Sequence, residues 1–162
     1  MRMLVYGSKG WIGSQFMDLV SGYDVLIGES RLDNIEQVVS ELSNKQPTHV
    51  FCFIGRTHGK IGDKIYTTID YLEQKGKLVD NIRDNLFSPI NLAKLCEQQN
   101  IHLTYLGTGC IFKFDENHPF GEEKNGFDER SRPNFFCSGY SVVKGFTDQM
   151  MSLFPNVLNL RI

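Results

Sequence analysis

Five short apolar runs alternate with segments of helical spacing, and this alternation is the feature that most limits how the chain can fold. The apolar runs cover residues 3–6, 24–27, 49–54, 103–106 and 157–162. Apolar side chains recur at helical intervals in residues 11–20, 32–42, 77–99 and 141–153. Strands that alternate with helices build a parallel sheet with helices on both faces. We therefore predict an α/β fold, a Rossmann-type doubly wound parallel sheet.

Three features interrupt this pattern. Residues 55–62 are rich in glycine, which predicts a loop. Pro89 falls inside the segment 77–99 and should interrupt or kink that helix, because proline cannot donate the helical hydrogen bond. Residues 113–134 are polar with scattered glycine and proline, so we expect a long surface excursion of a functional or mobile kind.

Length and composition describe an ordinary globular chain. It has 162 residues, of which 41% are hydrophobic and 22% charged. A net charge of −2 gives no basic surplus for nucleic acid or anionic lipid. Four cysteines without a CxxC pair argue against a metal or disulfide framework. With no apolar run near the ~20 residues that span a bilayer, and no signal-peptide core, we expect a cytoplasmic protein with no membrane partner.

The chain also stops directly on the last predicted strand. We expect residues 1–162 to form one domain of this fold that is incomplete at its C-terminus.

A glycine loop follows the first predicted strand and opens the first predicted helix. Gly7, Gly10 and Gly13 stand at intervals of three residues, with Trp11 and Ile12 between the last two. In such a loop the glycines allow a tight turn, a close approach of the backbone to a pyrophosphate and close packing of helix on strand. The helix N-terminus offers free N–H groups to the phosphates. The context favours dinucleotide binding over an ordinary glycine-rich turn.

The end of the second strand predicts the cofactor. A site that prefers NADH usually has an acid there for the ribose hydroxyls, whereas an arginine suits a 2′-phosphate. Gly28 occupies the expected position of the acid, and Arg31 follows closely. We predict NADPH. Glu29 keeps NADH possible, because a register one residue different would place it at the ribose.

Tyr140 and Lys144 lie four residues apart in the last predicted helix, so they share a face. A nearby ammonium favours the phenolate and should lower the pKa of the tyrosine, which suits it to proton transfer. Lys144 could also hold the nicotinamide ribose. Thr108, just after the fourth strand, could add a hydroxyl at the same carbonyl oxygen, or could be a helix cap or turn residue.

With these residues identified, nearly the whole chain resembles the extended short-chain dehydrogenase/reductases. Among them it is most like the bifunctional nucleotide-rhamnose synthases, which are 3,5-epimerase/4-reductases. The segments that carry the resemblance are Gly10-Trp11-Ile12-Gly13, residues 28–32, Gly55-Arg56-Thr57, Thr108-Gly109-Cys110-Ile111-Phe112, His118-Pro119, Pro133-Asn134-Phe135 and Tyr140-Ser141 with Lys144. The run from Thr108 to Phe112 is far more specific than the glycine loop.

The resemblance implies roles for several residues. Tyr140, Lys144 and Thr108 would form a reductase triad. Asn85 stands where the family has an asparagine near the triad and cofactor, although a residue of the helix surface or kink is an equal alternative. Gly55 would lie beside the cofactor and Arg56 beside the sugar, unless they belong to an ordinary loop. The family also continues into a smaller substrate lobe, most of which this chain lacks, together with a second epimerisation residue.

Cys110 decides between an epimerase/reductase and a simple reductase. The C–H bonds beside the ketone of a 4-keto sugar are acidic, and epimerisation needs a base there. Cys110 lies two residues from Thr108 and could reach the same ring. The residue alone favours a buried, unreactive thiol, whereas the surrounding motif favours catalysis.

We therefore expect NADPH-dependent 3,5-epimerisation and 4-keto reduction of a UDP- or dTDP-linked 4-keto-6-deoxy-hexose, giving nucleotide-L-rhamnose, in a chain that could be a homodimer. One alternative is a single-function 4-ketoreductase. A 4,6-dehydratase is disfavoured, because Gly109 and Cys110 stand where it has an acid. The other alternative is an inactive dinucleotide-binding module, against which the intact Tyr140–Lys144 pair counts.

Overall fold

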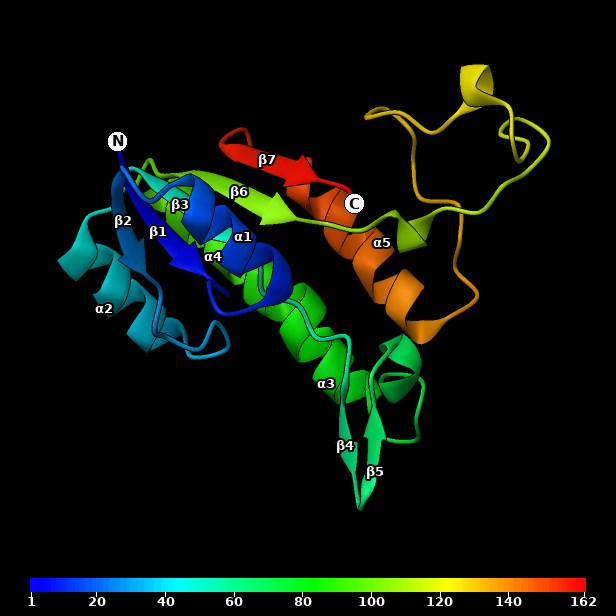
Figure 1. The fold of residues 1–162 in the computed structure, drawn as a ribbon, viewed down its shortest axis with the longest axis horizontal. Coiled ribbons are helices and arrows are strands. Elements are labelled where there is room, and N and C mark those ends of the chain that lie inside the picture. Colours follow the sequence, from blue (N-terminus) through cyan, green and yellow to red (C-terminus); the bar gives the residue numbers. More distant parts are fainter.

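A five-stranded parallel sheet forms the centre of the molecule (Figure 1). The computed structural model describes residues 1–162, apart from the side chain of Glu123. The strands are β1 (Arg2–Tyr6), β2 (Asp24–Ile27), β3 (His49–Cys52), β6 (His102–Leu106) and β7 (Val157–Leu160), in the spatial order β2-β1-β3-β6-β7. The order reverses between β1 and β3, the point where doubly wound sheets bind ligands at the carboxyl ends of their strands. The predicted Rossmann-type fold is confirmed.

Helices cover both faces of this sheet. On one face, the buried core joins α2 (Ile35–Lys45), α4 (Ser88–Gln98) and α5 (Gly139–Met151) to alternate strand residues. On the other face, Phe16 of α1 (Trp11–Leu19) packs on Phe51 and Phe53 with ring centroids 4.6 and 5.1 Å apart. Helix α2 begins three residues later than predicted, because the side chain of Asn34 caps it by accepting from the N–H of Gln37.

The segment 77–99 forms one continuous helical rod with a widened turn. Helix α3 (Leu78–Ile82) passes into a π-helical turn, Arg83–Phe87, which leads into α4. Pro89 lies in the first turn of α4 and cannot donate to the carbonyl of Asn85. That carbonyl accepts instead from the hydroxyl of Thr147 on α5, at 2.6 Å. Pro89 therefore goes with a widened turn and not with a break in the helix, and the hydrogen bond from Thr147 ties the rod to α5.

The loop predicted over residues 55–62 is partly wrong. Gly59–Ile61 (β4) and Lys64–Tyr66 (β5) form an antiparallel hairpin that projects away from the sheet in Figure 1. Gly62 takes the turn with a φ of 56°, and Asp63 follows it. A Gly-Asp pair between short apolar segments is a hairpin signal, so the sequence contained the evidence for this element.

The excursion after β6 is confirmed, and its own side chains order it. Its short 3-10 turns are η3 (Gly109–Ile111) and η4 (Glu123–Asn125). Asp115 accepts hydrogen bonds from the backbone and ring of His118 and from the amide of Asn134. Phe127 stacks between Phe112 and His118, with centroids 4.4 and 4.1 Å apart.

Glu41 of α2 is a buried carboxylate that fixes the loop after β2. It accepts hydrogen bonds from the phenol of Tyr6 at 2.9 Å, the backbone N–H groups of Glu29 and Ser30, and the ammonium of Lys45. Burial opposes its ionisation, but hydrogen bonds from Lys45 and this backbone outweigh burial and lower the pKa of Glu41 to about 2. Glu41 therefore fixes the backbone of the loop that carries Arg31.

We expect Glu41→Gln to destabilise the fold at neutral pH by on the order of 3 kcal/mol. The pKa of this carboxyl rises from about 2 in the folded chain to 4.5 when it is free. Its stabilisation is thus fully present above pH ~4.5 and is lost as the pH falls toward 2. Denaturant unfolding of both proteins at pH 7 and pH 3 measures this. A difference that does not shrink at pH 3 would contradict the assignment.

Within the described chain, no helix has both the length and the apolar character needed to cross a lipid bilayer.

Candidate active site

The glycine loop has the geometry of an anion-binding turn. Gly7 adopts a φ of 81°, and a Cβ atom on Gly13 would lie 2.1 Å from the carbonyl oxygen of Gly7. Helix α1 starts at Trp11 with no side-chain cap and no acid in its first turn. Its first N–H groups thus remain free for a ligand, and the positive end of the helix dipole faces the same way. The residues present fit a pyrophosphate.

A cavity of about 290 Å³ lies between the loops after β2 and β3, the strands on either side of β1. The residues lining it are Arg31, Leu32, Asp33, Ile54, Gly55, Arg56, His58, Asp84 and Ser88. It brings together the predicted cofactor residues Arg31 and Gly55. It also contains Arg56, which we expected at the sugar; in the described chain, Cys110 and Tyr140 lie outside this lining.

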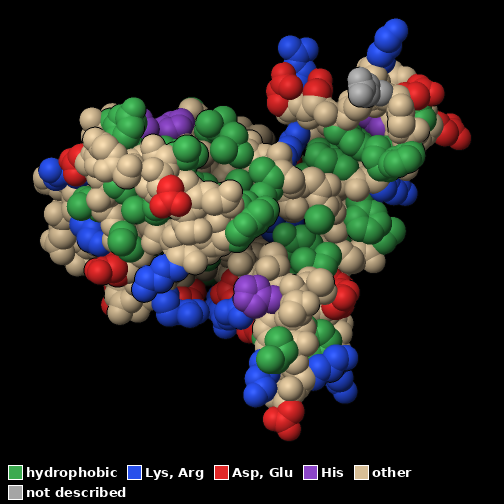
Figure 2. Space-filling view, viewed as in Figure 1, with side chains coloured by type: hydrophobic (Ala, Val, Ile, Leu, Met, Phe, Trp, Pro, Cys, Tyr) green, Lys and Arg blue, Asp and Glu red, His purple; other side chains and the backbone are tan. Residues whose placement is uncertain are grey.

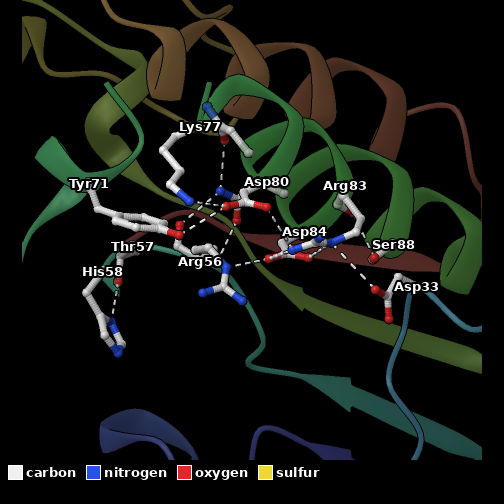
Figure 3. Close-up of polar contacts among 12 residues, drawn as sticks. Asp33, Arg56, Thr57, His58, Tyr71, Lys77, Asp80, Arg83, Asp84 and Ser88 are labelled. Carbon is white, nitrogen blue, oxygen red and sulfur yellow. Dashed lines mark hydrogen bonds and ion pairs between the residues drawn. The ribbon is translucent and has the colours of Figure 1, made fainter. Parts of the chain in front are cut away.

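Charged side chains along the cavity form a continuous network (Figure 3). Arg31 pairs with Asp33 at 2.8 Å, Asp33 lies 3.5 Å from Arg83, and Arg83 pairs with Asp84 at 2.7 Å. Arg56 makes a second pair with Asp84. Burial opposes ionisation of Asp84, but hydrogen bonds from Arg83 and Arg56 outweigh it and lower the pKa of the carboxyl. The network places Arg31 and Arg56 at the rim of the cavity, and each keeps N–H groups that these ion pairs do not use.

The structure explains why glycine stands at position 28. A Cβ atom there would lie 2.3 Å from the ring of Tyr6, so no acidic side chain fits at this point. The carboxylate of Glu29 lies 3.6 Å from the ammonium of Lys45 and is 80% exposed, in a different hollow from Arg31. The competing residue for NADH therefore faces away from the cavity that Arg31 lines.

Asn85 has a structural task. Its carbonyl oxygen accepts from the backbone N–H of Arg56 at 2.8 Å, and its amide donates to the carbonyl of Arg56 and to Asn81. With only 1% of its surface exposed, Asn85 is committed to the loop after β3. It positions Arg56 and Gly55 beside the cavity. The sequence pointed to the residue but not to this role.

A second group of residues gathers where β6 ends against α5. Tyr140 and Lys144 are both buried on α5, at 5% and 4% exposure. Thr108 caps the turn η3 by accepting from the N–H of Cys110, and its side chain lies close enough to the phenol of Tyr140 to lower the pKa of that group. The hydroxyl of Ser141 donates to the carbonyl of Cys110 at 2.7 Å, and the thiol of Cys110 is exposed. The structure thus joins Thr108 and Cys110 to the Tyr–Lys helix.

The electrostatics of this pair differ from the expectation. Burial raises the pKa of Tyr140 to about 12, and the hydrogen bond with Thr108 only partly offsets it. Burial likewise lowers the pKa of Lys144 to about 8. The predicted lowering of the tyrosine pKa by Lys144 is wrong for this structure, because the ammonium donates to Tyr105 at 2.5 Å rather than to Tyr140.

The hairpin region positions Tyr140, a contribution that the sequence analysis missed. Tyr71 and Leu72, which follow the hairpin, form a small apolar cluster with Tyr140. The carboxylate of Glu73 accepts from the N–H groups of Gly139 and Tyr140, each at 2.9 Å. Glu73 therefore caps α5 across more than sixty residues of chain, and no local sequence pattern marks such a cap.

Comparisons with known proteins extend this picture. A UDP-rhamnose synthase from Acanthamoeba polyphaga mimivirus, known from a crystal structure, is 52% identical with a TM-score of 0.89. The match covers 100% of this chain and 55% of that one. A bifunctional dTDP-4-dehydrorhamnose 3,5-epimerase/dTDP-4-dehydrorhamnose reductase from Arabidopsis thaliana is 33% identical over 99% of this chain and 51% of its own length.

A dTDP-4-dehydrorhamnose reductase from Bacillus anthracis, solved with NADP, shares the fold with a TM-score of 0.77 at 19% identity, over 99% of this chain and 52% of its own. No protein-family model matches the chain. The chain spans about half the length of these relatives. The sequence, the sheet and the residues at its carboxyl edge agree with one another: the chain has a Rossmann-type fold and is similar to nucleotide-rhamnose synthases along its whole length.

Proposed function

We propose that the chain is the dinucleotide-binding half of an NADPH-dependent enzyme that epimerises carbons 3 and 5 and reduces carbon 4 of a UDP- or dTDP-linked 4-keto-6-deoxy-hexose. The product would be nucleotide-L-rhamnose. The observation that carries this proposal is the group formed by Thr108, Cys110, Tyr140 and Lys144 at the end of β6, in a chain 52% identical to a UDP-rhamnose synthase.

The cofactor would occupy the glycine loop and the cavity beside it. Free N–H groups at the start of α1 suit a pyrophosphate, and Arg31 at the rim suits a 2′-phosphate. Releasing Arg31 to a phosphate would not isolate Asp33, because Arg83 lies 3.5 Å from that carboxylate. NADPH, when bound, would supply the two electrons of the reduction.

The residues of the second group would handle protons at one ketone. Tyr140 is the proton donor to the oxygen on carbon 4, since its raised pKa keeps the phenol protonated at neutral pH. Thr108 donates to the same oxygen, and the buried ammonium of Lys144 supplies a positive charge on the same helix as Tyr140. The thiolate of Cys110 removes the proton from a C–H bond beside the ketone, and the oxygen on carbon 4 takes up the negative charge of the enolate. A proton that exchanges with solvent then returns to the opposite face of the same carbon and restores the ketone. One polarised ketone would serve both reactions.

Incubation of the full-length gene product with NADPH and UDP-4-keto-6-deoxyglucose tests this function. We expect NADPH oxidation together with formation of UDP-L-rhamnose. A reduced sugar that keeps its original configuration at carbons 3 and 5 would instead identify a single-function reductase.

Cofactor choice gives a separate prediction. We expect NADPH to bind more tightly than NADH, and Arg31→Ala to weaken NADPH binding about 10- to 100-fold while leaving NADH unaffected. Trp11 is the only tryptophan, stands at the glycine loop and is 82% exposed, so its emission reports binding by energy transfer to the reduced nicotinamide.

Glu29→Gln is the matched control, because Glu29 adjoins Arg31 in the same loop but faces Lys45. It should leave both affinities unchanged. A wild-type preference for NADH, or an equal loss of both cofactors in Arg31→Ala, would contradict the role of Arg31.

A further inference from the structure

The ammonium of Lys144 is buried beneath the proposed ribose site with one strong partner. Lys144 is 4% exposed, and its Nζ donates to the phenol oxygen of Tyr105 at 2.5 Å. Over the described residues this is the only hydrogen bond that the ammonium donates. Nζ also lies 4.7 Å from the centroid of the Tyr105 ring. Tyr105 itself is 1% exposed on the interior strand β6, so neither group can exchange this contact for water without opening the core.

The other titratable groups near Lys144 do not replace Tyr105 as its hydrogen-bond partner. They are Cys52 on β3, Cys110 in η3 and Asp148 on α5 itself. Cys52 is fully buried, and burial raises its pKa to about 11, so the thiol is neutral. Asp148 is occupied by two hydrogen bonds from Arg161, each 2.8 Å, and one from Asn159. Asn85, which we expected near the triad, donates its amide hydrogens to Arg56 and Asn81.

We propose that Tyr105 is the positioning residue of the active site, holding the side chain of Lys144 in place and in its charged form. This proposal rests on the proposed function only in the use that it assigns to Lys144. A phenol oxygen that accepts from an ammonium favours the charged form, and the ring face adds an attraction for the cation. Tyr105 keeps its own proton, because burial raises its pKa well above the ordinary value. One bond to Tyr105 leaves two N–H bonds of the ammonium for hydroxyl groups of a ligand.

Tyr105→Phe removes the acceptor and keeps the ring, so it separates positioning from packing. We expect the pKa of Lys144, near 8 in the wild-type chain, to fall by about one to two units. Lysine titration followed by NMR on the ¹³Cε signals measures this directly, and Lys144→Met identifies the signal. In the enzyme assay the basic limb of the pH–rate profile should move down by the same amount.

Tyr6→Phe is the matched control. Tyr6 is also a fully buried tyrosine on a central strand, and its hydroxyl is bonded to Glu41 instead. It should cost stability without moving the pKa of Lys144. A folded Tyr105→Phe protein whose Lys144 titrates as in the wild type would overturn the proposal.

Two further observations keep the test decisive. If Tyr105→Phe does not fold, the wild-type spectrum still decides: a slowly exchanging Lys144 ammonium signal with an NOE to the Tyr105 ring supports the contact, and its absence contradicts it. Since the titration needs neither cofactor nor sugar, a full-length gene product that shows the pKa shift but reduces no sugar would refute the proposed function and leave the role of Tyr105 standing.

Discussion

Tyr140→Phe should lower the reduction of a 4-keto nucleotide-sugar by about 10²- to 10⁴-fold, the usual loss for a general acid. In the proposed function the phenol is the proton donor beside Thr108, and phenylalanine keeps the ring that packs on Tyr71 and Leu72. Epimerisation should fall as well, because the same hydroxyl stabilises the enolate oxygen. NADPH oxidation by the full-length gene product gives the rate, and a separate titration with NADPH shows whether the cofactor still binds.

Tyr66→Phe is the control for Tyr140→Phe. Its phenol, in the same apolar cluster, donates to Gln74 at 3.3 Å and belongs to the hairpin rather than to α5. Its loss should change turnover little. If Tyr140→Phe retained reduction within a few-fold of the wild type, Tyr140 would be a packing residue.

Cys110→Ser should reduce C–H exchange at the sugar ring by about 10²- to 10⁴-fold while sparing reduction. Serine has nearly the shape of cysteine but a far higher pKa, so it is a poor base toward carbon. The exposed position of Cys110 beside Thr108 suits contact with a substrate and disfavours the alternative of a buried, inert thiol. Deuterium uptake from heavy water measures exchange, and reduction is measured with an already epimerised 4-keto sugar.

Cys137→Ser is the control for Cys110→Ser. It alters another exposed cysteine of the same region, which lies just before α5, and should leave both reactions intact. Wild-type exchange in Cys110→Ser would identify Cys110 as a bystander.

The sequence predicted the elements whose signals are local. Each strand of the sheet is a short apolar run, and the glycine loop, Pro89 and the excursion all appear where their residues indicate. The hairpin was missed although Gly62-Asp63 marked its turn, because the glycines around it suggested a plain loop. The boundaries of α2 and α5 depend on caps, Asn34 and Ser138, which periodicity does not reveal.

The sequence identified residues that the structure brings together at the candidate site, but it did not predict most of their contacts. Thr108, Cys110, Tyr140 and Lys144 come together as their spacing and motif suggested. The partners of Lys144 and of the start of α5 are Tyr105 and Glu73, which lie 39 and at least 66 residues away. Contacts over such distances follow from the order of strands in the sheet. For the same reason Arg56 lines the same cavity as Arg31.

The surface in Figure 2 shows the hairpin and the excursion as two projections from the body. The hairpin region holds the first residues of α5 through Glu73, and the excursion is joined to η3 through the carbonyl of Ile111, which accepts from the N–H groups of Asn134 and Phe135. These two projections flank the ends of the segments that carry Tyr140 and Cys110.

The most direct test of one site for two reactions is the isotopic content of the product. The full-length gene product would be incubated with NADPH and UDP-4-keto-6-deoxyglucose in heavy water, and the sugar analysed by NMR and mass spectrometry. We expect UDP-L-rhamnose with deuterium at both carbon 3 and carbon 5. A reduced sugar of unchanged configuration that carries no ring deuterium would contradict it.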